Sequence, residues 1–151
     1  MNWREARLDN TNLKILLPCK PDKGNKTLML NGSSTSLEMI GCEAGGVLFA
    51  VSKLNLPFGV EPETVLNQWS SSVTSNMKAG ESRKSPFQIQ GENPTGLGIR
   101  LDAIGSGPRG KKITLTAVWF VQDRQLFHAA MYANQLLAEA VETFLSGLSL
   151  H

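Results

Sequence analysis

One segment near the C-terminal end constrains the fold more than any other part of the chain. Two apolar, β-rich runs, Ile113–Val121 and Leu126–Ala133, flank a short polar turn centred on Asp123 and Arg124. This pattern predicts a long β-hairpin. Counting outward from the turn gives the expected pairs: Trp119 with His128, Ala117 with Ala130, and Leu115 with Tyr132.

Both faces of this hairpin are apolar. Because side chains alternate between the faces of a strand, each face can be read from the sequence. One face holds Trp119, Leu115, Ile113 and Leu126, and the other holds Phe120, Val118, Phe127 and Met131. Strands of this kind occur where a sheet is covered on both sides. The sequence therefore predicts a sheet between two covering layers.

The rest of the chain offers further strands and two helices to build these layers. Amphipathic spacing predicts a helix over Pro62–Met77 with Trp69 facing the core, and a second from an Asn134 cap to about Leu145. Glu81–Pro86 is expected to be a polar loop. The other expected strands are Trp3–Leu8, Leu13–Leu17, Lys26–Asn31, Ser34–Cys42, Val47–Leu54, Phe87–Gln90 and Leu97–Ile104.

Short turns between these strands predict an antiparallel meander, since antiparallel neighbours can be joined by tight connections. A length of 151 residues suits one domain, and no repeat or linker divides the chain. We therefore expect a single α+β domain over residues 1–151, with a mostly antiparallel sheet flanked by two helices. The longest apolar runs are too short to span a membrane.

Two cysteines, Cys19 and Cys42, bear on the compartment. A two-residue turn at Gly32 and Ser33 would pair Lys23 with Cys42 and bring Cys19 within reach of a disulfide. Such a bond would contribute roughly 3 kcal/mol to stability and suit an oxidising compartment. Two buried, reduced thiols are the alternative reading, and a zinc site lacks further ligands.

No motif predicts a reaction centre. His128 is the one internal histidine, and opposite Trp119 it is typical of a packed sheet residue. An enzyme would need a site assembled from dispersed residues such as His128, Tyr132, Asp102 and Arg100. The glycines at 105, 107 and 110 match a dinucleotide fingerprint, but a strand follows them instead of a helix. We expect no enzyme activity, no cofactor and no metal.

A sheet edge or the basic loop Gly105–Lys112 is the first binding surface to consider. Arg109, Lys111 and Lys112 lie together there, on a loop that a rigid sheet would present. A net charge of +2 is too small to predict a nucleic-acid partner. The expected ligand is a protein or a small molecule, and a homodimer through a sheet edge is a further possibility.

The order of parts resembles the PsbP-like fold. The features behind this resemblance are Leu17-Pro18-Cys19, Gly41-Cys42-Glu43, a small meander through Val47–Val51, a helix with Trp69, and a long hairpin followed by a Phe-containing helix. The resemblance covers roughly Trp3 to Leu150 and is strongest to small exported bacterial proteins of unknown role. It implies an α/β/α sandwich and carries over no site residue.

These observations favour an exported, periplasmic, non-enzymatic domain that binds a protein or a small ligand. The chain begins Met-Asn-Trp-Arg-Glu without an export signal, so this reading expects the sequence to be a mature form. A cytosolic assembly factor or adaptor, with reduced cysteines, is the alternative. An enzyme built around His128 is the third reading.

Overall fold

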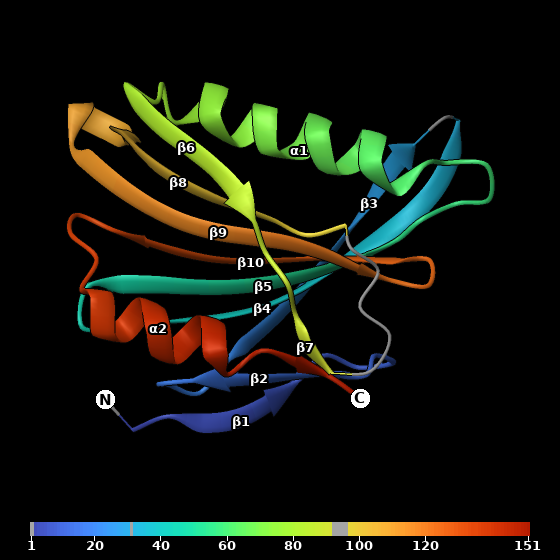
Figure 1. Cartoon of the computed structure of the whole chain (residues 1–151), viewed down its shortest axis with the longest axis horizontal. Coiled ribbons are helices and arrows are strands. Elements are labelled where there is room, and N and C mark those ends of the chain that lie inside the picture. Colours follow the sequence, from blue (N-terminus) through green and yellow to red (C-terminus); the bar gives the residue numbers. More distant parts are fainter. Residues whose placement is uncertain (1, 31, 92–96) are drawn as a thin grey trace.

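The computed structural model describes residues 2–30, 32–91 and 97–151. Its centre is a seven-stranded sheet in the order β3-β4-β5-β10-β9-β8-β6, with every neighbouring pair antiparallel (Figure 1). The strands are β3 (Asp22–Leu30), β4 (Ser33–Ala44), β5 (Val47–Asn55), β6 (Glu81–Pro86), β8 (Ile99–Ser106), β9 (Lys112–Gln122) and β10 (Gln125–Ala133). The predicted α+β class with a large antiparallel sheet is confirmed.

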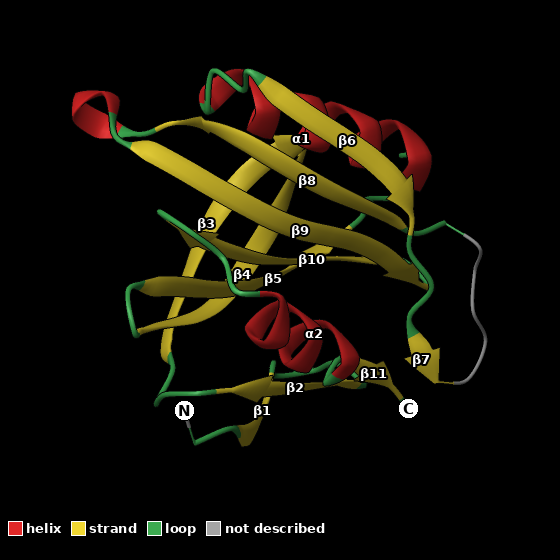
Figure 2. Cartoon of the chain, turned by 60° about the vertical axis from the view of Figure 1, so that its left-hand side comes forward, coloured by secondary structure: helices red, strands yellow, loops and turns green. Residues whose placement is uncertain are grey.

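A smaller sheet and two helices complete the fold. The small sheet has the order β1-β2-β11-β7, from β1 (Arg4–Arg7), β2 (Leu13–Leu17), β7 (Gln90–Gly91) and β11 (Ser149–Leu150). The helices are α1 (Pro62–Asn76) and α2 (Ala138–Ser146), and a 3-10 turn, η1, spans Pro108–Gly110. Figure 2 shows α1 on one side of the large sheet, and α2 with the small sheet on the other.

Each face of the large sheet has its own hydrophobic core. Towards α1, Val65 and Leu66 of the helix pack with Leu115 and Trp119 of β9. Towards α2, Phe144 packs with sheet residues such as Phe49, and the two rings meet edge to face 5.4 Å apart. The sandwiched sheet that the two-sided apolar hairpin predicts is therefore present.

The register of the β9–β10 hairpin agrees with the sequence prediction. His128 pairs with Trp119, Ala130 with Ala117, and Tyr132 with Leu115. Asp123 has φ of 54°, the left-handed conformation that such a tight turn requires.

The predicted register of the β3–β4 hairpin is wrong by two residues. Leu30 pairs with Ser33, and Lys23 pairs with Ile40 instead of Cys42. The turn falls one residue earlier than expected because Gly32, with φ of 76°, occupies its left-handed position. The predicted pairing of Asn31 lies outside the described residues. A shift by two residues leaves each side chain on the same face.

Cys19 and Cys42 form a disulfide with Cα atoms 5.9 Å apart. Pairing of Asp22 with Gly41 brings the chain before β3 beside Cys42. The two-residue register error does not prevent the contact, since the extended segment before β3 spans the difference. The structure therefore has a disulfide and not the two reduced thiols of the alternative prediction.

Three local predictions are wrong at polar or short segments. Glu81–Pro86 forms the edge strand β6 instead of a loop, because its polar residues remain exposed while its backbone pairs with β8. Within Phe87–Gln90 only Gln90 is in a strand, the short β7. The closing helix begins at Ala138 and not after Asn134, since residues 134–137 lead from the sheet to the face that α2 covers.

Candidate functional site

The four residues of the enzyme hypothesis lie on opposite faces of the large sheet. His128 and Tyr132 pair with Trp119 and Leu115, which belong to the core under α1. Arg100 pairs with Val118, and Asp102 lies two residues further along β8 on the same face, towards α2. The structure therefore does not bring the four groups together in one site.

His128 is enclosed by aromatic rings. Its imidazole stacks on Trp119 with centroids 4.3 Å apart, and the Trp69 ring of α1 lies 4.9 Å away at a tilt. The Nδ1 atom donates to the carbonyl oxygen of Val118 at 3.3 Å, because a carbonyl can only accept. Burial lowers the pKa of His128 to about 4, partly offset by that hydrogen bond. The ring is a neutral packing element at physiological pH.

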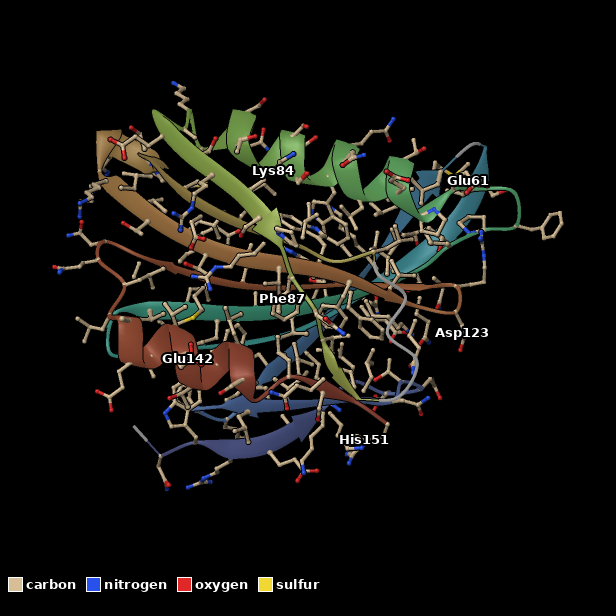
Figure 3. The ribbon with its side chains drawn as sticks, in the orientation of Figure 1. Glu61, Lys84, Phe87, Asp123, Glu142 and His151 are labelled. Carbon is tan, nitrogen blue, oxygen red and sulfur yellow. A yellow bond between two sulfur atoms is a disulfide. The ribbon has the colours of Figure 1, made fainter. Side chains whose placement is uncertain are left out.

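Arg100 and Asp102 form a polar cluster on the other face. The guanidinium donates from Nε to one carboxylate oxygen of Asp102 at 2.9 Å, and Thr116 donates to the other at 2.8 Å. Arg100 also lines a hollow of about 200 Å³ with Phe87 and Glu142, both labelled in Figure 3. With its charge matched by Asp102, Arg100 is poorly suited to hold an anion.

One buried lysine is not among the residues that the sequence pattern singles out. Lys53 is 2% exposed, and its Nζ lies 3.1 Å from a carboxylate oxygen of Glu38. The signal was a single cation inside the apolar strand β5. Because a buried charge is strongly destabilising without a partner, this contact is explained as a structural ion pair.

The three basic residues singled out from the sequence do come together. Arg109, Lys111 and Lys112 line one hollow of about 750 Å³, which is larger than the hollow of about 380 Å³ beside Arg83. We call this hollow the basic bowl. Its described lining is Gly107, Pro108, Arg109, Lys111, Lys112, Ile113 and Asn134.

Hydrogen bonds within the β8–β9 connection fix the bowl. Gly107 donates to the carbonyl oxygen of Lys111 at 2.8 Å, and Gly110 donates to that of Gly107 at 3.1 Å. Beside the hollow, the Thr114 hydroxyl of β9 donates to the carbonyl oxygen of Asn134 at 3.1 Å and holds the chain after β10. The loop that presents the cations is therefore ordered before any ligand arrives.

Arg109 occupies a strained position within the bowl. Its φ and ψ are 64° and 21°, in the left-handed region that costs a non-glycine residue about 1–2 kcal/mol. Gly110 beside it, at φ of 72°, adopts that region freely. An arginine held where glycine would be more stable is a feature that functional sites often show.

The charge of the bowl is unbalanced. Arg109, Lys111 and Lys112 are exposed, and none of them makes an ion pair with a described residue. No carboxylate stands among the described residues that line the hollow. Pro108 and Ile113 add apolar surface to it. This arrangement suits a ligand that combines negative charge with an apolar group.

Asn134 was not recognised from the sequence as part of this site. Its pattern suggested a helix cap, and it lies more than twenty residues from the basic loop. Only the pairing of β9 with β10 brings it to the bowl. No local signal could have shown this neighbour.

Two other classes of site are absent from residues 2–30, 32–91 and 97–151. Within these ranges no three His, Cys, Asp or Glu side chains gather as metal ligands would. No helix in them is long and apolar enough to cross a membrane.

Comparisons with known proteins identify no family and no function for the chain. No family model matches the chain, and no curated protein matches it. Among solved structures, the chain is similar to the crystal structure of PA94, a protein of unknown function from Pseudomonas aeruginosa. The TM-score is 0.42 with 10% identity, over 88% of this chain and 83% of the other.

Proposed function

We propose that the chain is a non-enzymatic binding domain that recognises acidic segments of a protein at the basic bowl. The observation behind this proposal is the group of three cations, Arg109, Lys111 and Lys112, which pair with no described carboxylate and surround one hollow of about 750 Å³. That volume lies within the roughly 300–1,000 Å³ typical of ligand sites. A protein segment can supply both the carboxylates and the apolar side chain that the lining favours.

The setting of this function is proposed to be the periplasm. The Cys19–Cys42 disulfide supports an oxidising compartment, where such bonds persist. The order of strands and helices resembles that of small exported PsbP-like proteins. We include this relation in the proposal. The separation of His128 from Asp102 by the sheet supports a role without catalysis.

A short acidic peptide tests the site. The probe is a fluorescently labelled peptide of glutamates with one central phenylalanine, titrated with the protein and followed by fluorescence anisotropy. We expect saturable binding that weakens as salt is added, because the attraction is between exposed charges. Replacing Arg109, Lys111 and Lys112 together by alanine should reduce the affinity at least about tenfold.

The control removes the same charge elsewhere. Arg4, Lys20 and Lys26 are exposed and lie outside the bowl, so their joint replacement by alanine matches the charge change without touching the site. This control should bind the peptide nearly as well as the wild type does. Equal losses in both triple variants would reject the bowl, since net charge alone would then explain binding.

A further inference from the structure

The loop between β5 and α1 presents a phenylalanine wholly to solvent. Phe58 is 103% exposed, the highest value among the large apolar side chains described as exposed. Its neighbours Leu56 and Val60 are buried in the core under α1 and fix both ends of the loop. The Phe58 side chain is therefore outside the core, although the residues two positions before and after it are buried there.

The loop is rigid. Val60 donates to the carbonyl oxygen of Pro57 at 3.2 Å, and Gly59 has φ of 85°, as in a type II turn with Phe58 at its first central position. The Arg124 guanidinium donates to the carbonyl oxygens of Pro57 and Val60, the latter at 2.9 Å. Because the loop is already ordered, docking of the ring would cost little conformational entropy.

Carboxylates flank this ring. Glu61 follows three residues after Phe58, Glu63 lies in the first turn of α1, and Asp123 precedes the arginine that holds the loop. Figure 3 labels Glu61 and Asp123 at the same end of the molecule. An anionic lipid surface would repel these groups, so the ring is better suited to a protein pocket with a basic rim.

The basic bowl has the chemistry that this loop requires. It combines Pro108 and Ile113 with three cations that pair with no residue in the described part of the chain, whereas the loop combines Phe58 with carboxylates. Figure 1 shows the β8–β9 connection and the β5–α1 loop at opposite ends of the long axis. The two surfaces of one molecule cannot meet, but those of two molecules can.

We propose that the β5–α1 loop of one copy docks in the basic bowl of a second copy, with Phe58 inserted among Arg109, Lys111 and Lys112. This inference rests on the proposed function and names a second copy of the chain as the source of the acidic segment. Such a contact joins unlike surfaces, so it repeats from molecule to molecule and builds open, head-to-tail chains. One small interface per contact makes the association weak and reversible.

Sedimentation equilibrium over a wide range of protein concentration tests the association. The wild type should show an average mass that rises steadily with concentration and falls when salt is added. A loop variant with Phe58→Ala and Glu61→Gln should stay monomeric, because loss of a central aromatic anchor weakens such contacts about thirtyfold. The triple bowl variant, Arg109→Ala, Lys111→Ala and Lys112→Ala, should also stay monomeric.

Mixing the two variants gives the decisive result. The loop variant keeps an intact bowl and the bowl variant keeps an intact loop, so the mixture should form a one-to-one dimer that grows no further. A wild type that remains monomeric at every concentration would overturn the inference. Association that survives in both variants, as expected of pairing through an exposed sheet edge such as β3, would overturn it as well.

The peptide experiment separates this inference from the proposed function. If the acidic peptide binds the wild type and not the bowl variant while the wild type stays monomeric, the proposed function stands and the second copy is not the partner. If the peptide also fails to bind, both are rejected. Phe58 is fully exposed, so its replacement leaves the fold intact and the readings remain interpretable.

Discussion

The two faces of the large sheet are covered by different means. Towards α1, one helix of 15 residues covers the sheet, and an imidazole lies between two indole rings. Towards α2, a helix of 9 residues acts with the four-stranded small sheet, and a disulfide ties Cys42 of β4 to Cys19. One face depends on a buried titratable group and the other on a covalent bond, so different conditions should weaken them.

The same division explains why the four residues of the enzyme hypothesis do not come together in one site. The alternation of side chains along β8, β9 and β10 sends Asp102 towards one cover and His128 towards the other. Residues that look close on paired strands are separated by the thickness of the sheet. Residues on neighbouring strands can share a site only when their side chains lie on the same face of the sheet.

Breaking the disulfide is expected to have the largest effect on the α2 face. Replacing Cys19 and Cys42 by alanine should lower the free energy of unfolding by about 3 kcal/mol, because the unfolded chain loses a constraint over a loop of 23 residues. Urea denaturation of the variant and the wild type, each with and without reductant, measures this. Reductant should shift the wild type only.

The same bond tests the compartment. Alkylation and intact mass of protein taken from its native cells should find both thiols oxidised. Two free thiols would contradict the periplasmic proposal and favour the cytosolic adaptor. Equal unfolding midpoints for the variant and the wild type would show that the bond does not stabilise the α2 face.

Acid is expected to weaken the α1 face by a somewhat smaller amount. The pKa of His128 is lowered to about 4 in the folded state, so the unfolded chain binds this proton first. Stability is therefore retained above the ordinary pKa of 6.5 and lost as the pH falls from there towards 4. Between about pH 7 and pH 5 the loss attributable to His128 is roughly 2 kcal/mol.

A His128→Phe variant isolates this contribution, because it keeps an aromatic ring between Trp69 and Trp119 but cannot titrate. Chemical denaturation at a series of pH values should give a wild-type stability that falls relative to the variant across this window. Parallel pH profiles would mean that His128 is accessible to protons in the folded protein, contrary to its burial.

The smallest expected effect lies at the bowl, beyond the packed part of both faces. Arg109→Gly should raise the free energy of unfolding by about 0.5–1 kcal/mol, since glycine adopts φ of 64° without strain but costs more chain entropy. The same change should weaken binding of the acidic peptide. Thermal and urea unfolding measure the first effect, and anisotropy measures the second.

A variant that gains stability and loses peptide affinity would match the exchange of stability for function seen at strained sites. The control is Lys111→Gly, at a residue with φ of −68°, which should lose affinity without gaining stability. If the free energy of unfolding of Arg109→Gly does not exceed that of the wild type, the left-handed conformation of Arg109 does not destabilise the fold.

Much of the fold was accessible from the sequence because its signals are local or periodic. The two-sided hairpin gave the correct pairing of Trp119 with His128, and the helical spacing around Trp69 gave α1. Edge strand β6 was missed because a strand that is exposed and paired on one side needs no apolar alternation. The start of α2 was missed because Asn134 lies in the segment that leads from the sheet to the helix. It does not cap the helix, although its residue type favours capping.

By itself the sequence determined the sheet with two covered faces, the presence of both helices and the basic character of the β8–β9 loop. These follow from hydrophobic periodicity and turn residues, which act over a few positions. Tertiary structure alone decided that Asn134 completes the bowl, that Asp102 and His128 face apart, and that Phe58 stands free while Arg124 holds its loop. These depend on strand register and long-range packing, which bring together residues that no local pattern connects.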